Sequence, residues 1–237
     1  MIAVIGGSGL TRLPELNITQ RRIVRTPYGL TSSPLLLGTL GSRSIVFLAR
    51  HGLNHSLAPH EINYRANIWA LHSIEAEAVV SVSSVAALND ACEPGSLVVP
   101  DDLVDYTFGR RSTFFEGREN EVVHTDFSEP YDHALRQALL EHARSHQTPV
   151  HARAVYGCLQ GPRMPTRAEV RRYRNDGIDI IGMTGMPEAV LARELGLPYA
   201  HLCGVTGTAC INSGRETACN LSGARAIEKI RRLLVDL

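Results

Sequence analysis

The chain has 237 residues, of which 44% are hydrophobic and 20% are charged, a composition typical of a globular protein. Its 24 Lys and Arg residues balance 24 Asp and Glu residues, so the formal net charge is zero. Because proteins that bind nucleic acid usually carry a basic excess, this balance argues against that class, and we expect no nucleic-acid partner.

The cysteines and the N-terminal pattern bear on the environment of the protein. There are five cysteines, an odd number, and none of them form a Cys-x-x-Cys pair, which argues against a disulfide framework or a structural zinc site. The first residues lack a basic segment followed by a long apolar stretch, and no apolar run reaches membrane-spanning length. We therefore expect a cytoplasmic protein with no membrane partner.

Short apolar runs alternate with segments of helical periodicity along the chain. In chain order, we expect strands at residues 2–5 and 45–49, a helix at 67–78, strands at 78–82 and 96–99, a helix at 130–143, a strand at 150–158, a helix at 167–175, a strand at 178–182, a helix at 187–195, a strand at 199–205 and a helix at 224–237. This alternation predicts an α/β fold, and the lack of repeats and linkers predicts a single domain over residues 1–237.

Four of the predicted strands end in small or polar residues, and ligands of open α/β sheets bind beyond the carboxyl ends of strands. Glycine turns expose backbone N–H groups, hydroxyls donate hydrogen bonds, and a guanidinium group can bind a phosphate through two parallel bonds. Each feature alone also fits a plain turn, a solvated loop, a helix cap or core packing. Together they favour an anion site built from Gly6-Gly7-Ser8-Gly9, Arg50-His51, Ser83-Ser84 and Met183-Thr184.

Other kinds of catalytic site fit the sequence less well. His51 and His55 could begin a metal site, but no third ligand follows at helical spacing and Gly52 disfavours a helix, so we expect no metal. The chain has neither a Gly-x-Ser-x-Gly nucleophile motif nor an evident pair of catalytic carboxylates. These features favour a reaction in which phosphate is the nucleophile and the protein positions and polarises the reactants.

Five motifs with consistent spacing resemble the purine nucleoside phosphorylase and methylthioadenosine phosphorylase family. They lie at residues 5–10 (IGGSGL), 49–52 (ARHG), 63–71 (NYRANIWAL), 161–163 with 167–169 (GPR and RAE) and 182–188 (GMTGMPE). The resemblance runs from residue 2 to about residue 203. It is nearest to the bacterial S-methyl-5′-thioinosine phosphorylase branch, through residues 106–107, 124–128 and 182–186.

This resemblance implies a homotrimer whose subunits have a central twisted mixed β-sheet flanked by helices. It implies that inorganic phosphate, as co-substrate and without a cofactor, attacks the anomeric carbon of 5′-methylthioinosine or 5′-methylthioadenosine and releases the free purine base and methylthioribose 1-phosphate. The implied phosphate-binding residues are Ser8, Arg50, His51, Ser83, Ser84 and Thr184. The implied nucleoside contacts are Met183 at the ribose, Met164 at the base, and His124, which would reach the site of the neighbouring subunit.

The sequence departs from the family pattern after the last predicted strand. The family's Asp or Asn that hydrogen-bonds purine N7 falls on Gly207, and the second acid of the adenosine-type enzymes falls on Ala209. We assign no certain catalytic residue, and Asn212 is a candidate substitute. Losing one such contact costs roughly 3–4 kcal/mol of transition-state stabilisation. Two hypotheses follow: an active phosphorylase, or a catalytically impaired family member that binds phosphate and a planar aromatic or nucleoside-like ligand.

Overall fold

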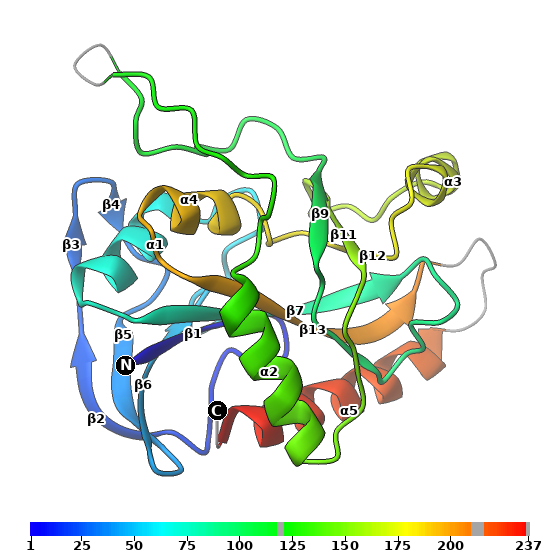
Figure 1. Ribbon diagram of the computed structural model, residues 1–237, viewed down its shortest axis with the longest axis horizontal. Helices are drawn as coiled ribbons and strands as arrows, with labels where there is room; N and C mark the ends of the chain where they lie inside the picture. The colour runs from blue at the N-terminus through cyan, green and yellow to red at the C-terminus, as the bar shows by residue number, and fades with distance from the viewer. Residues whose placement is uncertain (118–120, 210–215, 236–237) are drawn as a thin grey trace.

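The protein was analysed as a computed structural model, which describes residues 1–117, 121–209 and 216–235. Within these ranges, eleven strands form one mixed sheet. At its centre, β1 (Ile2–Gly6) pairs in parallel with β6 (Arg43–Ala49) and with β7 (Ala78–Ala87), and β7 pairs in parallel with β13 (Tyr199–Thr208). Figure 1 shows these strands crossing the middle of the molecule.

Further strands extend the central four on both sides. On one side lie β5 (Leu35–Leu40) and the edge strand β2 (Asn17–Arg22), which pair antiparallel. On the other side lie β8 (Leu97–Val98) and β10 (Val150–His151), while β12 (Ile180–Gly182) pairs antiparallel with β7 and leads to β11 (Val155–Cys158) and β9 (Asp102–Asp105). Two further strands, β3 (Arg25–Thr26) and β4 (Gly29–Leu30), form a separate hairpin.

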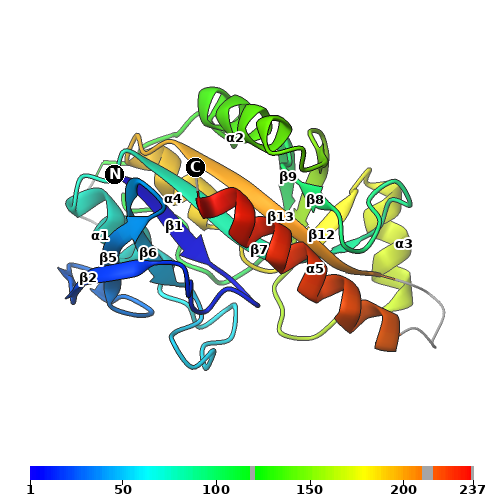
Figure 2. The same ribbon diagram turned by 90° about the horizontal axis from the view of Figure 1, so that it is seen from below.

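Helices cover both faces of the sheet, as the two views in Figures 1 and 2 agree. On one face, α1 (Tyr64–Ser73) and α4 (Glu188–Glu194) pack with β1, β6 and β7 in one hydrophobic cluster. On the other face, α2 (His133–Ser145) and α5 (Glu216–Val235) pack in a second cluster. The fifth helix, α3 (Arg167–Asn175), packs in a smaller cluster beside β11 and β12. None of the described helices combines the length and the apolarity that crossing a bilayer requires.

The α/β fold with a mixed sheet flanked by helices is confirmed, and the structure corrects several boundaries. The strand expected at 78–82 continues to Ala87, because pairing with β13 and β12 holds its second half. The strand expected at 150–158 is two strands, which pair with different neighbours. The helix expected at 67–78 runs from Tyr64 to Ser73, and Asn63 caps its N-terminus. The last helix, expected from residue 224, begins at Glu216.

Candidate functional site

A cavity opens where β1, β6, β7, β12 and β13 bring their functional residues together. Its volume is about 180 Å³, and it is open to solvent on one side. Ser8 reaches it from the turn after β1, and His51 from the turn after β6. The lining residues are Ser8, His51, Pro59, Ser83, Ser84, Val85, Ala86, Leu159, Met164, Pro165, Ile181, Gly182, Met183, Thr184 and Thr206.

One end of this cavity is formed by hydroxyl groups from separate segments. The Ser83 hydroxyl on β7 lies 3.0 Å from the Thr184 hydroxyl, which follows β12, and both side chains are largely buried. The Ser84 hydroxyl donates to the main-chain carbonyl of Ser8 at 3.0 Å, which ties the glycine turn after β1 to β7. Convergent hydroxyls of this kind can donate hydrogen bonds to an anion.

The other end of the cavity is largely apolar, with Thr206 of β13 as its polar residue. Ala86 on β7 pairs with Ile181 on β12 and with Gly207 on β13. Paired residues of adjacent strands present their side chains to the same face, and both Ala86 and Ile181 line the cavity. Because Ala86 lies three residues beyond Ser83, the two ends are separated by about 10 Å along the strand. The cavity thus changes from polar to apolar over roughly the length of a nucleoside with a phosphate.

Arg50 lies beneath the cavity and is not one of its lining residues. Its guanidinium is fully buried, where Nε and Nη2 donate to the Glu188 carboxylate at 2.5 and 3.0 Å. Nη2 also donates to the Ser81 hydroxyl at 2.6 Å, and Nη1 to the Val82 carbonyl at 2.8 Å. Although burial opposes the charged form, the charge of Glu188 and its hydrogen bonds raise the pKa of Arg50 above its usual value. Arg50 is therefore a permanently charged group whose charge is balanced within the protein.

Arg50 also supports the glycine turn. A Cβ at Gly7 would lie 2.6 Å from Arg50 Nη1 and 2.6 Å from the Val82 carbonyl oxygen. Only glycine fits this close approach of main chain to guanidinium. The Arg50 side chain thus packs directly against the main chain of the turn that carries Ser8.

His51 lines the cavity as a neutral ring. Its Nδ1 lies 2.8 Å from the Leu57 carbonyl oxygen, so Nδ1 carries the proton and Nε2 is the acceptor. Burial lowers the pKa of His51 to about 4, and the positive charge of Arg50 acts in the same direction. His55 packs against this ring with 4.5 Å between ring centroids, but the described parts of the chain contain no cluster of metal-ligating side chains.

Known proteins have similar sequences and the same fold. The phosphorylase superfamily model matches residues 1–237. The chain belongs to the phosphorylase superfamily. It is 50% identical over 216 residues, 91% of this chain and 87% of the relative, to a probable S-methyl-5′-thioinosine phosphorylase of Pseudomonas syringae pv. tomato. It is 41% identical over 241 residues, 100% of this chain and 88% of the relative, to a 6-oxopurine nucleoside phosphorylase of Pyrococcus furiosus.

Solved structures of the superfamily have the same fold. A methylthioadenosine phosphorylase from Schistosoma mansoni in complex with adenine matches with a TM-score of 0.94 and 31% identity, over 99% of this chain and 89% of that chain. The mixed sheet flanked by helices is thus a nucleoside phosphorylase fold.

Most of the residues that the sequence nominates for this phosphorylase site do meet in one cavity. Met183 and Met164 line it beside the hydroxyl groups, and Met164 is 65% exposed at the mouth. Thr184 does not cap α4, because Pro187 occupies the N-cap without a side-chain hydrogen bond. Ala209 packs in the small cluster with Leu88 rather than lining the cavity.

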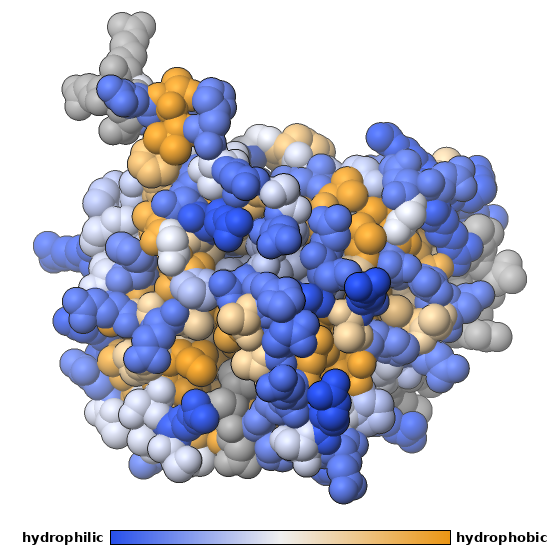
Figure 3. Space-filling model, in the orientation of Figure 1, coloured by the Kyte–Doolittle hydropathy of each residue, from blue (hydrophilic) through white to orange (hydrophobic). Residues whose placement is uncertain are grey.

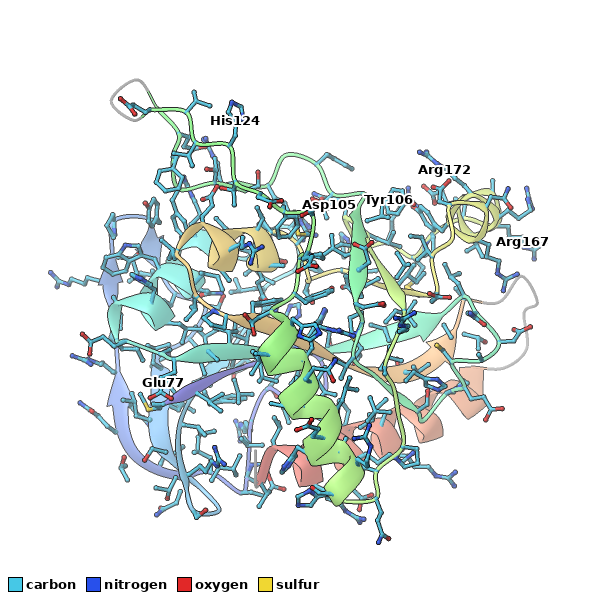
Figure 4. All side chains as sticks on the ribbon, viewed as in Figure 1. Glu77, Asp105, Tyr106, His124, Arg167 and Arg172 are labelled. Atoms are coloured by element: carbon cyan, nitrogen blue, oxygen red, sulfur yellow. The ribbon has the colours of Figure 1, made fainter. Side chains whose placement is uncertain are left out.

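His124 lies away from the cavity. His124 is exposed and lies on a long irregular arm, described over residues 107–117 and 121–131, that projects from the body of the molecule (Figure 4). It does not line the cavity of its own chain. Asn212 lies outside the described residues, so its place relative to the cavity stays a prediction.

The sequence analysis does not identify Tyr156 or Arg110, whose hydrogen bonds hold main-chain segments next to the cavity. The Tyr156 hydroxyl accepts hydrogen bonds from the main-chain N–H groups of Thr184 and Gly185, at 3.3 and 3.2 Å. Arg110, at the root of the arm, donates to the carbonyls of Met186 at 2.6 Å and Gln160 at 2.8 Å. Both residues act on main-chain atoms that are distant in sequence, and a local pattern contains no signal for such contacts.

Proposed function

We propose that the protein cleaves purine nucleosides by phosphorolysis, with 5′-methylthioinosine or 5′-methylthioadenosine as substrate. The products are a free purine base and methylthioribose 1-phosphate. The observation that carries the proposal is the cavity that joins the hydroxyls of Ser83 and Thr184 to an apolar end over about 10 Å. The named relatives act on nucleosides of both 6-oxopurine and methylthio type, which supports the substrate class.

Inorganic phosphate is the co-substrate in this proposal, and no other cofactor takes part. Its oxygens accept hydrogen bonds from the hydroxyls of Ser8, Ser83 and Thr184, whereas the proton of the Ser84 hydroxyl is engaged by the Ser8 carbonyl. The neutral His51 ring lines the same cavity, and its Nε2 can accept a hydrogen bond from the O–H group of monohydrogen phosphate. Arg50 contributes through the turn that it supports, since most of its N–H groups are already engaged with Glu188, Ser81 and Val82.

The nucleoside lies between the hydroxyl end and the apolar end. Met183 contacts the ribose and Met164 covers the base, because thioether side chains are polarizable and adapt to flat ligands. The protein positions phosphate beside the anomeric carbon, which converts a reaction between two free molecules into one within a complex.

A homotrimer completes this proposal, in which His124 reaches the 5′-pocket of a neighbouring subunit. Its support is the projecting arm, where Val122 and Val123 are 78% and 47% exposed and hydrophobic atoms gather on the surface (Figure 3). An apolar arm of this kind suits contact with another protein surface.

We further propose that residues 1–237 form a single domain and that the protein acts in the cytoplasm.

The deciding experiment incubates the purified protein with each of the nucleosides 5′-methylthioinosine, 5′-methylthioadenosine and inosine, with and without phosphate. We expect phosphate-dependent base release and formation of a sugar 1-phosphate. Binding of nucleoside and phosphate without any base release would instead support the catalytically impaired family member. If no nucleoside is bound or cleaved, the proposal is wrong.

A further inference from the structure

The turn between β12 and α4 carries Thr184, and the conformation of this turn decides where the Thr184 hydroxyl lies. Thr184 lines the cavity, and its hydroxyl lies 3.0 Å from that of Ser83. The main-chain N–H groups of Thr184 and Gly185 both donate to the side-chain hydroxyl of Tyr156, at 3.3 and 3.2 Å. The turn is thus held by a side chain of β11, which lies 28 residues before Thr184 in the chain.

Tyr156 occupies a closely fitted place beside this turn. Its side chain is fully buried, and the residue pairs with Ile180 in the register of β11 and β12. A Cβ at Gly185 would lie 2.7 Å from Tyr156 Cε1, and a Cβ at Gly182 would overlap the hydroxyl. The His201 ring packs edge-on against the Tyr156 ring, with 4.8 Å between the ring centroids. These contacts restrict the ring, so its hydroxyl is a fixed point for the turn.

The Tyr156 hydroxyl also decides which groups of the turn are available to an anion. Each main-chain N–H has one proton to donate, so the two N–H groups that bind Tyr156 are not free to bind phosphate. Burial raises the pKa of Tyr156 well above its usual value, so the hydroxyl stays neutral near a bound anion. The Thr184 hydroxyl is therefore the donor that this part of the turn presents to the cavity.

From these contacts we infer that Tyr156 is a positioning residue of the phosphate site. Its hydroxyl holds the main chain at residues 184 and 185, and thereby keeps the Thr184 hydroxyl next to that of Ser83. Tyr156 is not one of the residues that line the cavity, so it acts through Thr184 rather than on the reactants. The inference rests on the proposed phosphorolysis and names a residue on which its affinity for phosphate depends.

The first test removes only the hydroxyl group of Tyr156. Tyr156→Phe keeps the ring and deprives two buried N–H groups of their acceptor, so the turn shifts to find other partners. A hydrogen bond to a charged ligand changes binding by about 10- to 150-fold, so weakening the one from Thr184 should raise KM for phosphate by about tenfold. KM for the nucleoside, and kcat at saturating phosphate, should change far less. An unchanged KM for phosphate would overturn the inference.

Tyr131→Phe is the matched control for this variant. Tyr131 is a buried tyrosine of the same hydrophobic cluster, and its hydroxyl has no hydrogen-bond partner in the part of the chain that the structure describes. Both variants lose one buried hydroxyl, and only Tyr156→Phe loses bonds to the turn. Tyr131→Phe should keep the wild-type KM for phosphate, and an equal rise in the two variants would count against the inference.

A double variant shows whether Tyr156 acts through Thr184. In the Thr184→Val protein the hydroxyl that Tyr156 positions is gone, so adding Tyr156→Phe should raise KM for phosphate little further. Residues in contact that act as a unit show non-additive effects of this kind. If the two substitutions instead multiply each other's full effects, Tyr156 acts by another route and the role assigned to it is wrong.

A second variant approaches the same contact from the turn. Gly185→Ala keeps every hydroxyl, but its Cβ meets the Tyr156 ring, so KM for phosphate should rise here too. If Tyr156→Phe does not fold, this variant decides, and an unchanged KM for phosphate would contradict the inference.

Calorimetric titration with inorganic phosphate alone separates this inference from the proposed function, because it measures affinity without turnover. Equal phosphate affinity of the wild type and Tyr156→Phe overturns the inference and leaves phosphorolysis standing. Weaker binding by Tyr156→Phe, with no base release by the wild type, supports the positioning role and overturns phosphorolysis. If the wild type binds no phosphate, both fail.

Discussion

Arg50 and Glu188 form an ion pair that is fully shielded from solvent, with Nε and Oε1 2.5 Å apart. The two residues are 138 positions apart in sequence, in the turn after β6 and at the start of α4. Their pairing joins two of the segments that build the hydroxyl end of the cavity. Arg50, which the sequence predicts to be a phosphate ligand, thus mainly stabilises the site through its ion pair with Glu188.

The first prediction concerns the stability that this ion pair provides. Glu188→Ala leaves a buried guanidinium without its counter-charge, so we expect the free energy of unfolding to fall by about 3–5 kcal/mol. Urea unfolding followed by circular dichroism measures the change. Glu228→Ala is the control, because Glu228 pairs with Arg232 at the surface of α5, where such pairs contribute only about 0.3–0.5 kcal/mol. Equal losses in the two variants would contradict the role assigned to Glu188.

The second prediction concerns the hydroxyl end of the cavity. Thr184→Val keeps the shape of the side chain and removes its hydroxyl, and Ser83→Ala removes the partner hydroxyl 3.0 Å away. A hydrogen bond to a charged ligand contributes about 1.5–3 kcal/mol, so each variant should lower kcat/KM for phosphate by about 10- to 150-fold. Initial rates over a phosphate series measure this. Thr148→Val, at a partly exposed threonine after α2 and outside the cavity lining, serves as control. An unchanged phosphate dependence would place the anion elsewhere.

The third prediction concerns acid sensitivity. His201 is fully buried, neither ring nitrogen has a hydrogen-bond partner among the described residues, and burial lowers its pKa to about 3. In the unfolded chain His201 therefore binds a proton near pH 6.5, whereas in the folded chain it stays neutral at that pH. The stability contributed by the neutral ring is complete above that pH. It is lost as pH falls toward 3, by about 1.4 kcal/mol per pH unit.

His201→Leu should flatten this pH dependence. Urea unfolding at pH 7.5, 5.5 and 4.5 measures the slope for the variant and for the wild type. His51, whose pKa burial also lowers, to about 4, leaves part of the slope in place. The exposed His72 provides the control substitution His72→Leu, which should retain the wild-type slope. A His201→Leu variant that loses stability in acid as steeply as the wild type would contradict the assignment.

The fourth prediction concerns Arg110 as a positioning residue. It holds the carbonyls of Met186 and Gln160 on two sides of the cavity, so Arg110→Ala should displace the Thr184 and Leu159 segments. Small displacements of groups that orient reactants can cost about 100-fold in rate. We expect kcat to fall by about tenfold or more, and guanidinium ions added to the assay to restore part of it.

Arg111 offers a matched control for this experiment. Its side chain is largely exposed and pairs with Glu116 at 3.0 Å, away from the cavity. Arg111→Ala should keep wild-type kcat, and guanidinium ions should not affect it. If Arg110→Ala loses only thermal stability and retains kcat, Arg110 has a structural role alone.

The sequence predicts the parts of this protein that local patterns govern. Helix α3 matches its expected range because Thr166 and Glu169 form a capping box that fixes its start. The glycines and polar residues just after β1 and β6 and the serines within β7 are visible in the sequence, and these three segments do meet at one cavity. The sequence analysis does not predict β2, because β2 is exposed along its whole length and lacks an alternating pattern. It also omits β5, although β5 is apolar and largely buried.

Contacts between distant segments lie beyond such patterns. An arginine beside a histidine fits a phosphate ligand, and nothing local indicates that Glu188 engages it 138 residues later. The same holds for Tyr156, whose hydroxyl holds two main-chain N–H groups near the cavity. The pairing of Gly207 with Ala86 likewise follows from the sheet register, which only the assembled fold defines.

The measurement that tests the central claim most directly is release of purine base by the purified protein, with and without inorganic phosphate. Both 5′-methylthioinosine and 5′-methylthioadenosine are supplied, so that a preference for either base is detected. Phosphorolysis predicts that base release requires phosphate and yields one methylthioribose 1-phosphate per base. Base release at the same rate without phosphate, or no release from either nucleoside, would contradict the claim.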